Sequence, residues 1–227
     1  MENHLIDHPE HPWAARQSDI GLIALVGSAG ALQSFRTILR ALPPHFSIPV
    51  LVCQHRMTRN SPRDILVQIL QSACSLPVMQ ACDDMLLAGG MAYVAPPDRQ
   101  LTVINRRTSV RESRPTDNFR PSFNLLFESL AADYGSRLIV VVLSGSLNDG
   151  AVGVVKVKAN GGRVIVQDPD GASHRGMANA AISTGCADFV LPLENIASAL
   201  TAIAMVPGAT DLFTATSPAW TGRRRSV

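Results

Sequence analysis

The feature that most constrains the fold of this chain is the regular alternation of short apolar runs with helix-like segments. Runs rich in Val, Ile and Leu are typical of strands that are buried on both faces, as in parallel sheets. Such runs predict strands at residues 20–26, 48–54, 91–95, 101–105, 138–143, 163–167 and 187–191. Helical patterns fall between several of them, at residues 31–42, 62–73, 122–134, 152–160, 176–184 and 193–205. The alternation predicts an α/β fold with three layers, α/β/α, and a mostly parallel, Rossmann-like doubly wound central sheet.

Both ends of the chain lack this alternation. Residues 1–18 are polar, with two prolines and three histidines, and residues 207–227 end in Gly-Arg-Arg-Arg-Ser-Val. The histidines could bind a metal and the arginines an acidic partner, but solvated tails are the simpler interpretation. We therefore expect one domain at residues 19–206 between two disordered tails.

Composition narrows the classes of partner. Hydrophobic residues make up 46% of the 227 residues, which is enough for a sizeable core. The net charge of +2 and the 5% of aromatic residues argue against nucleic acid as a partner. No apolar run approaches the roughly 20 residues needed to cross a membrane, and the acidic residues before position 20 have the wrong charge for a signal peptide. The four cysteines form no CxxC pair, so we expect free thiols in a cytoplasmic protein.

In folds of this class, ligands bind where parallel strands end and helices begin, and three such strand ends carry reactive side chains. The first is Gly27-Ser28-Ala29-Gly30, directly after the strand predicted at 20–26. Small residues allow a tight turn that leaves Ser28 at the start of a helix, where free backbone N–H groups could stabilise an oxyanion. Two other interpretations stay open, namely a phosphate-binding loop and a glycine turn in which Ser28 only caps the helix.

The second strand end carries His55 and the third carries Asp149. His55 follows the strand at 48–54 and is well placed to act as a general base, although a lone histidine is more often structural. Asp149 follows the apolar strand at 138–143, where it could cap the next helix or orient a histidine. Ser28, His55 and Asp149 together supply a nucleophile, a base and an orienting acid. The trio is a stronger signal than any one of its members.

Neighbouring side chains leave alternatives open. Ser144 and Ser146 are rival nucleophiles, but they precede a turn and do not begin a helix. Arg56 and Arg59 could orient a carboxylate or a phosphate. A nucleotide-binding enzyme would combine Arg56 with the loop at 27–30, yet the strand before His55 ends without the acid that binds a ribose hydroxyl in dinucleotide folds.

These separated motifs resemble, in the same order, those of the catalytic domain of the chemotaxis protein-glutamate methylesterase CheB. The similarity extends over residues 20–205 and rests on residues 23–30, 54–55, 93–99, 120–122, 143–145, 148–151 and 176–177. The resemblance implies a parallel α/β fold and a Ser/His/Asp triad formed by Ser28, His55 and Asp149. It implies no metal and no organic cofactor.

The resemblance also implies a reaction and its partners. The expected reaction is hydrolysis of glutamate γ-methyl esters on a methylated chemoreceptor or a similar signalling protein, with release of methanol. Deamidation of receptor glutamines would follow the same route. The residues before the first predicted strand are too few for the receiver domain that commonly precedes this catalytic domain, so control by phosphorylation would need a separate response-regulator partner.

The chain departs from the family pattern at two places. The family usually has Ser-Thr-Gly-Gly after the first strand, whereas Ala29 and Ala31 occupy the second and fourth of these positions here. Ser146 and Leu147 stand where the family has Met and Gly. A non-catalytic or altered-substrate signalling module with the same fold is therefore an alternative.

Overall fold

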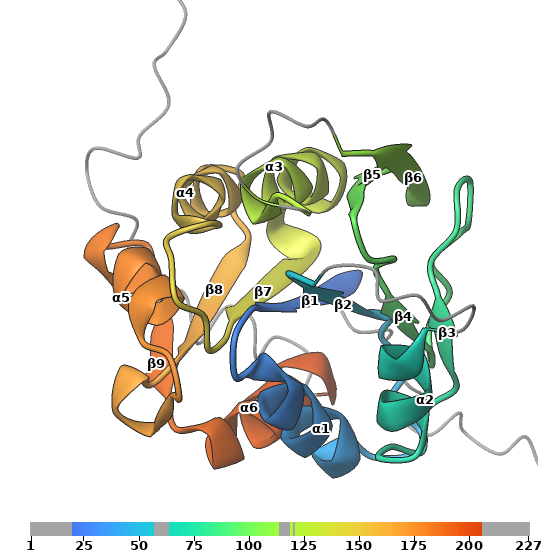
Figure 1. Ribbon diagram of the computed structural model, residues 1–227, viewed down its shortest axis with the longest axis horizontal. Coiled ribbons are helices and arrows are strands. Elements are labelled where there is room, and N and C mark those ends of the chain that lie inside the picture. Colours follow the sequence, from blue (N-terminus) through green and yellow to red (C-terminus); the bar gives the residue numbers. More distant parts are fainter. Residues whose placement is uncertain (1–19, 57–63, 114–118, 120, 206–227) are drawn as a thin grey trace, which may run out of the picture.

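The computed structural model describes residues 20–56, 64–113, 119 and 121–205, which form three layers (Figure 1). The central layer is a sheet of seven parallel strands in the order β3-β4-β2-β1-β7-β8-β9. These strands are β1 (Leu22–Gly27), β2 (Val50–Gln54), β3 (Val78–Gln80), β4 (Ala92–Val94), β7 (Leu138–Val142), β8 (Arg163–Gln167) and β9 (Phe189–Leu191). The strand order reverses between β1 and β7, which confirms the predicted doubly wound α/β fold.

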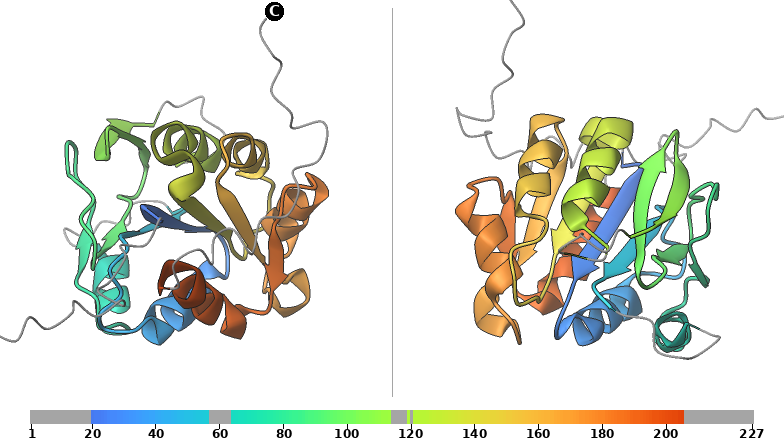
Figure 2. Two further views of the ribbon diagram at one scale, coloured as in Figure 1. Left: turned by 180° about the vertical axis from the view of Figure 1, so that it is seen from behind. Right: turned by 45° about the horizontal axis from the view of Figure 1, so that its top comes forward.

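Helices cover both faces of the sheet (Figures 1 and 2). They are α1 (Ala31–Ala41), α2 (Ile65–Gln71), α3 (Phe123–Tyr134), α4 (Ala151–Ala159), α5 (Gly176–Ser183) and α6 (Leu193–Met205). Successive side chains of a strand point to opposite faces, so Leu22, Ala24 and Val26 of β1 pack in one core with α3, α4 and α5. Ile23 and Leu25 pack in the other core with α1, α2 and α6.

One predicted strand lies outside the central sheet. The segment predicted at 101–105 belongs to β5 (Arg99–Ile104), which pairs antiparallel with β6 (Arg107–Glu112) in a separate hairpin beside α3 (Figure 2). Asn105 and Arg106 form the turn, and both have positive φ, 53° and 61°, as a type I′ turn requires. Grouping this segment with the strands of the parallel sheet is therefore wrong, because a two-residue turn can join only antiparallel strands.

Other sequence expectations have mixed outcomes. The helix predicted at 62–73 is shorter as α2, which begins after Asp64, whose side chain accepts the N–H of Leu66 at 3.0 Å. In the described part of the chain, none of the helices combines the length and the apolar character needed to span a membrane. The two predicted tails and Arg59 lie outside the described residues.

Candidate active site

Loops from three strands meet at the carboxyl ends of β1, β2 and β7. The backbone N–H of His55 donates to the carbonyl of Gly27 at 3.1 Å, and the N–H of Ser28 donates to the carbonyl of Ser144 at 2.9 Å. Ligands of doubly wound sheets bind at this edge, where the strand order reverses. The fold thus brings the loops that carry Ser28, His55 and Asp149 to one place.

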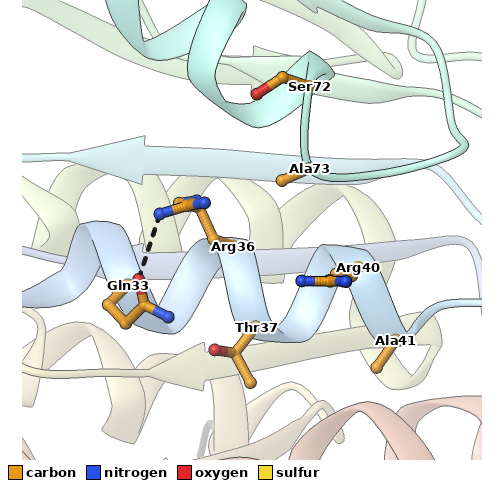
Figure 3. Close-up of a pocket in the computed structure, with 7 residues that line it drawn as sticks. All are labelled: Gln33, Arg36, Thr37, Arg40, Ala41, Ser72 and Ala73. Atoms are coloured by element: carbon orange, nitrogen blue, oxygen red, sulfur yellow. Dashed lines mark hydrogen bonds between the residues drawn. The ribbon is translucent and has the colours of Figure 1, made fainter.

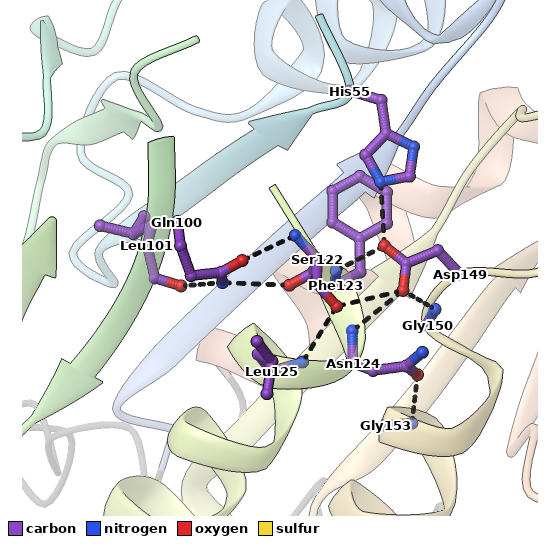
Figure 4. Close-up of polar contacts among 10 residues, drawn as sticks. All are labelled: His55, Gln100, Leu101, Ser122, Phe123, Asn124, Leu125, Asp149, Gly150 and Gly153. Carbon is purple, nitrogen blue, oxygen red and sulfur yellow. Dashed lines mark hydrogen bonds and ion pairs between the residues drawn. The ribbon is translucent and has the colours of Figure 1, made fainter. Parts of the chain in front are cut away.

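His55 and Asp149 form a hydrogen-bonded pair at this edge (Figure 4). The His55 Nε2 and Asp149 Oδ2 atoms are 2.9 Å apart, and the side chains are 15% and 0% exposed. A buried carboxylate on one ring nitrogen fixes the tautomer of a histidine and stabilises its protonated form. Within the described residues the other ring nitrogen, Nδ1, makes no hydrogen bond, so the pair can act as a general base toward a group on that side.

The carboxylate of Asp149 is held by backbone donors. Its Oδ2 atom accepts the N–H of Phe123 at 2.6 Å, and its Oδ1 atom accepts the N–H groups of Asn124 at 3.2 Å and Gly150 at 3.0 Å (Figure 4). Two of these donors begin α3, where the helix dipole favours negative charge. Asp149 therefore caps α3 and not the helix that follows it, since the N-cap residue of α4 is Gly150, without a side-chain cap.

Two aromatic rings fix the plane of the His55 ring. The Phe123 ring is stacked on it with a centroid distance of 3.9 Å and an interplanar angle of 3°, and the Phe119 ring lies 5.5 Å away at 12°. Neither phenylalanine was identified from the sequence. The signal available there was the helix start at Pro121-Ser122, which both rings flank.

Ser28 lies half-buried between β1 and α1. Gly30, the N-cap residue of α1, has a φ of +77°, which lets the chain turn tightly after Ser28. A Cβ atom at Gly145 would lie 3.1 Å from the Ser28 Cβ and 2.1 Å from the Met177 Sδ, so Ser28 is closely surrounded. In the described part of the chain no hydrogen bond joins Ser28 Oγ to His55. In enzymes without bound substrate such bonds are often long or unformed.

The rival candidates have other environments. Ser144 is buried, with 1% exposure, whereas Ser146 is exposed. Arg56 forms an ion pair with Asp64 and donates to the carbonyl of Ala95 at 2.8 Å. Its guanidinium is thus already engaged by protein acceptors, which weakens the nucleotide-binding alternative.

Cys53, which precedes Gln54 in β2, carries a buried free thiol beside the site. Burial raises the pKa of its thiol, and the charge of Asp149 raises it further, so the group stays protonated and is a poor nucleophile. Within the described residues, no group of three or more His, Cys, Asp or Glu side chains could hold a metal ion.

A groove of about 640 Å³ lies away from this site, between α1 and the end of α2 (Figure 3). Gln33, Arg36 and Arg40 line it from one face of α1, and Ser72 lines it from the end of α2. Neither the glycine turn after β1 nor the His55–Asp149 pair contributes to its walls. The groove is therefore separate from the candidate active site at the ends of the strands.

Comparison with known proteins agrees with the geometry. The sequence model of the CheB methylesterase family matches residues 23–200. A Leptospira interrogans protein named for protein-glutamate methylesterase and protein-glutamine glutaminase activity is 38% identical over 171 residues, which are 75% of this chain and 88% of that protein. A protein-glutamate methylesterase/protein-glutamine glutaminase of Rhizobium meliloti is 35% identical over 86% of this chain, which spans only 54% of that protein.

A solved structure shows the same fold. The crystal structure of the Thermotoga maritima CheB methylesterase catalytic domain superposes with a TM-score of 0.73 and 31% sequence identity. The match covers 82% of this chain and 99% of that domain. The chain therefore belongs to the CheB methylesterase family.

Proposed function

We propose that this chain is a serine hydrolase that cleaves glutamate γ-methyl esters on a methylated receptor protein and releases methanol. The observation that carries the proposal is the hydrogen bond between His55 and the buried Asp149, next to the loop that presents Ser28. The names of the relatives support the same reaction. Glutamine side chains would be deamidated by the same route, with ammonia as the leaving group.

The proposed reaction begins when Ser28 Oγ attacks the ester carbonyl carbon. His55 Nδ1 takes the hydroxyl proton, because Nε2 is bonded to Asp149. The N–H groups of Ala29 and Gly30 bind the tetrahedral oxyanion, and one such donor is worth about 3 kcal/mol in comparable enzymes. His55 then gives its proton to the departing methoxide, which leaves as methanol, and a glutamyl ester of Ser28 remains.

Water completes the cycle. His55 takes a proton from a water molecule, which attacks the glutamyl ester, and then returns this proton to the departing Ser28 Oγ. The glutamic acid side chain that is released loses its remaining proton to solvent and becomes the carboxylate. Asp149 holds the ring in register through both halves of the reaction and stabilises its protonated form. No step of this route needs a metal or an organic cofactor.

The proposal extends to partners and domain limits. The substrate protein would be a methylated chemoreceptor or a similar signalling protein, met in the cytoplasm. A separate response regulator would supply phosphorylation control. The catalytic domain would occupy residues 19–206, a range that contains the family match at residues 23–200.

The test is methanol release from a radiomethylated chemoreceptor. Wild type should release methanol, and Ser28→Ala and His55→Ala should each lower kcat by at least a thousandfold. Ser146→Ala is the matched control, because Ser146 is an exposed serine in the loop between Ser144 and Asp149. Its kcat should stay within about threefold of wild type.

Absence of methanol release from folded wild type would refute the methylesterase proposal. A serine-directed fluorophosphonate then separates the alternatives. Labelling of Ser28 would indicate a hydrolase with another substrate, and lack of labelling would indicate a non-catalytic signalling module.

A further inference from the structure

We propose that Ser144 is a positioning residue that aims the N–H of Gly30 at the oxyanion. This inference rests on the proposed function and adds a residue to it that touches neither the substrate nor the triad side chains. Its basis is a set of hydrogen bonds that Ser144 makes with the turn after β1.

Ser144 holds this turn at two points. Its carbonyl accepts the N–H of Ser28 at 2.9 Å, and its Oγ donates to the carbonyl of Ala29 at 2.8 Å. Ser144 itself is only 1% exposed, and a hydrogen bond from a buried side chain constrains geometry more strongly than one at the surface.

The peptide group that joins Ala29 to Gly30 is planar and trans, so its C=O and N–H point in opposite directions. Because Ser144 Oγ holds the carbonyl of Ala29 on the buried side, the N–H of Gly30 points away from Ser144. Within the described part of the chain, this N–H has no acceptor. A fixed backbone donor without a partner is what an oxyanion needs.

The peptide group that joins Ser28 to Ala29 is also held through its carbonyl, here by Ala31 and Gln54. The carbonyl of Ser28 accepts the N–H of Ala31 at 3.2 Å and the Nε2 group of Gln54 at 3.3 Å. The N–H of Ala29 therefore points the other way, and among the described residues it too has no acceptor. The directions of both N–H groups in the proposed oxyanion site are thus set by hydrogen bonds to the carbonyl oxygens of the same two peptide groups.

The Ser144 hydroxyl is itself held in place. Its Oγ accepts the N–H of His174 at 3.1 Å, which directs the hydroxyl proton toward an acceptor, and the carbonyl of Ala29 is the nearer of the two available. The N–H of Ser144 donates to Oε1 of the buried Gln167 at 3.2 Å. A Cβ atom at Gly30 would lie 2.8 Å from this Oγ, so the hydroxyl packs directly against the turn.

The experiment compares Ser144→Ala with Ser129→Ala. Ser129 is a matched control because its Oγ also donates to a backbone carbonyl at 2.8 Å and accepts a backbone N–H at 3.1 Å, but on α3, away from the turn. Three quantities are measured on full-length protein: kcat and KM for methanol release, the rate of Ser28 labelling by a fluorophosphonate, and the inhibition constant of a boronic acid that forms a tetrahedral anion on Ser28.

Ser144→Ala should lower kcat by about ten- to a hundredfold and leave KM within about twofold, because the Gly30 donor acts on the oxyanion and not on the ground-state ester. Phosphonate labelling should slow, and the boronate inhibition constant should rise, by about the same factor. Ser129→Ala should leave all three within about twofold. Ser144→Cys, which keeps the volume and a weak S–H donor, should fall between Ser144→Ala and wild type.

Several results would overturn the proposal. One is a Ser144→Ala enzyme whose kcat, labelling rate and boronate inhibition equal those of Ser129→Ala. Another is a rise in KM with unchanged kcat, which indicates an altered binding surface. If Ser144→Ala fails to fold, Ser144→Cys decides alone, and wild-type values there refute the role.

The labelling assay separates this proposal from the methylesterase function. If wild type cleaves no receptor ester but its Ser28 is labelled, and Ser144→Ala slows that labelling, the substrate assignment fails and the role of Ser144 stands. If wild type neither turns over nor reacts with either probe, both proposals fail.

Discussion

The carboxylate of Asp149 has two roles, one in stability and one in catalysis, which mutations can separate. It accepts three backbone N–H groups, two of them from the first turn of α3, and it also binds His55. The first task is a matter of stability, because buried donors without acceptors are costly. The second sets the tautomer of the histidine. An amide can replace a carboxylate as a hydrogen-bond acceptor but cannot stabilise an imidazolium by its charge.

We predict that Asp149→Asn and Asp149→Ala differ in stability but not in their loss of activity. Asn keeps one acceptor oxygen, but Phe123 donates to Oδ2 of Asp149 whereas Asn124 and Gly150 donate to Oδ1, so the amide NH2 group faces at least one donor. The free energy of unfolding should therefore fall by about 1–3 kcal/mol, while kcat falls by about 10⁴ because the tautomer is wrong. Ala leaves several buried donors unpaired and should cost at least about 3 kcal/mol more. Urea unfolding and methanol release measure the two effects. Equal destabilisation by both substitutions would contradict the capping role.

At the residue scale, the sequence predicted which side chains belong to the site but not how they contact one another. His55 and Asp149 were found because each follows an apolar strand, and the structure joins them by a hydrogen bond. Their catalytic roles and that of Ser28 stay predictions. The stacking of Phe123 on His55 was missed because it depends on how α3 packs, and Ser144 was considered as a nucleophile because burial cannot be seen in a sequence.

Helices α3 and α4 support the site as a packed pair. Gly153 on α4 donates its N–H to Oδ1 of Asn124 on α3 at 2.7 Å. A Cβ atom at Gly153 would lie 2.7 Å from the Cβ of Phe127 and 3.1 Å from the Cα of Asn124. The close approach of the two helices, and with it the place of Asp149 at the start of α3, therefore depends on a residue without a side chain.

We predict that Gly153→Ala destabilises the protein although alanine is the better helix former. The propensity gain is about 1 kcal/mol, whereas overpacking against Phe127 and the backbone of Asn124 costs about 1–3 kcal/mol, so the free energy of unfolding should fall by up to about 2 kcal/mol. Gly171→Ala is the control, since nothing lies within 4 Å of a Cβ atom there; its effect should stay within about 0.5 kcal/mol. Urea unfolding decides, and a stabilised Gly153→Ala would refute the tight contact.

At the element scale, predictability follows burial. Strands β1, β7 and β8 are buried along their whole length. The sequences of β1 and β7 are accordingly continuous apolar runs, and β8 has three apolar residues between Arg163 and Gln167. Strand β3 has only three residues, two of them exposed, and leaves no such pattern. Strand β6 has mostly polar residues, and the Asn105-Arg106 turn before it lacks the glycine that usually marks a hairpin. The sequence therefore did not predict the hairpin of β5 and β6.

For the molecule as a whole, we predict that alkaline pH destabilises the fold through Tyr134. Burial, and then the charge of Asp133, raises the pKa of Tyr134 from its ordinary value of 10.0 to about 12 in the folded protein. The unfolded chain loses the phenol proton at lower pH than the folded one. The stability that neutral Tyr134 contributes is therefore complete below about pH 10 and is lost as the pH rises toward 12.

The measurement compares urea unfolding of wild type and Tyr134→Phe between pH 8 and pH 11.5, so that other titrating groups cancel in the difference. The stability advantage of wild type over the variant should be constant up to about pH 10. Above that pH it should decline by no more than about 1.4 kcal/mol per pH unit. A difference that stays flat up to pH 11.5 would show that Tyr134 titrates alike in both states.

The limits of the domain give the last prediction. The family match ends at residues 23 and 200, but core side chains lie beyond it at both ends. Leu22, Ile20, Ile203 and Ala204 are 0%, 5%, 4% and 5% exposed. Each large aliphatic side chain that is lost removes about 1.5–3 kcal/mol of the stabilisation that comes from burial, and total stabilities are only about 5–15 kcal/mol.

A protein of residues 19–206 should therefore melt within a few degrees of the full chain and keep its hydrolase activity. A protein of residues 23–200 should melt at least ten degrees lower or lose its cooperative transition. Equal melting of the two would mean that the described outer core contributes nothing, and a collapse of the longer one would mean that residues outside 19–206 belong to the domain.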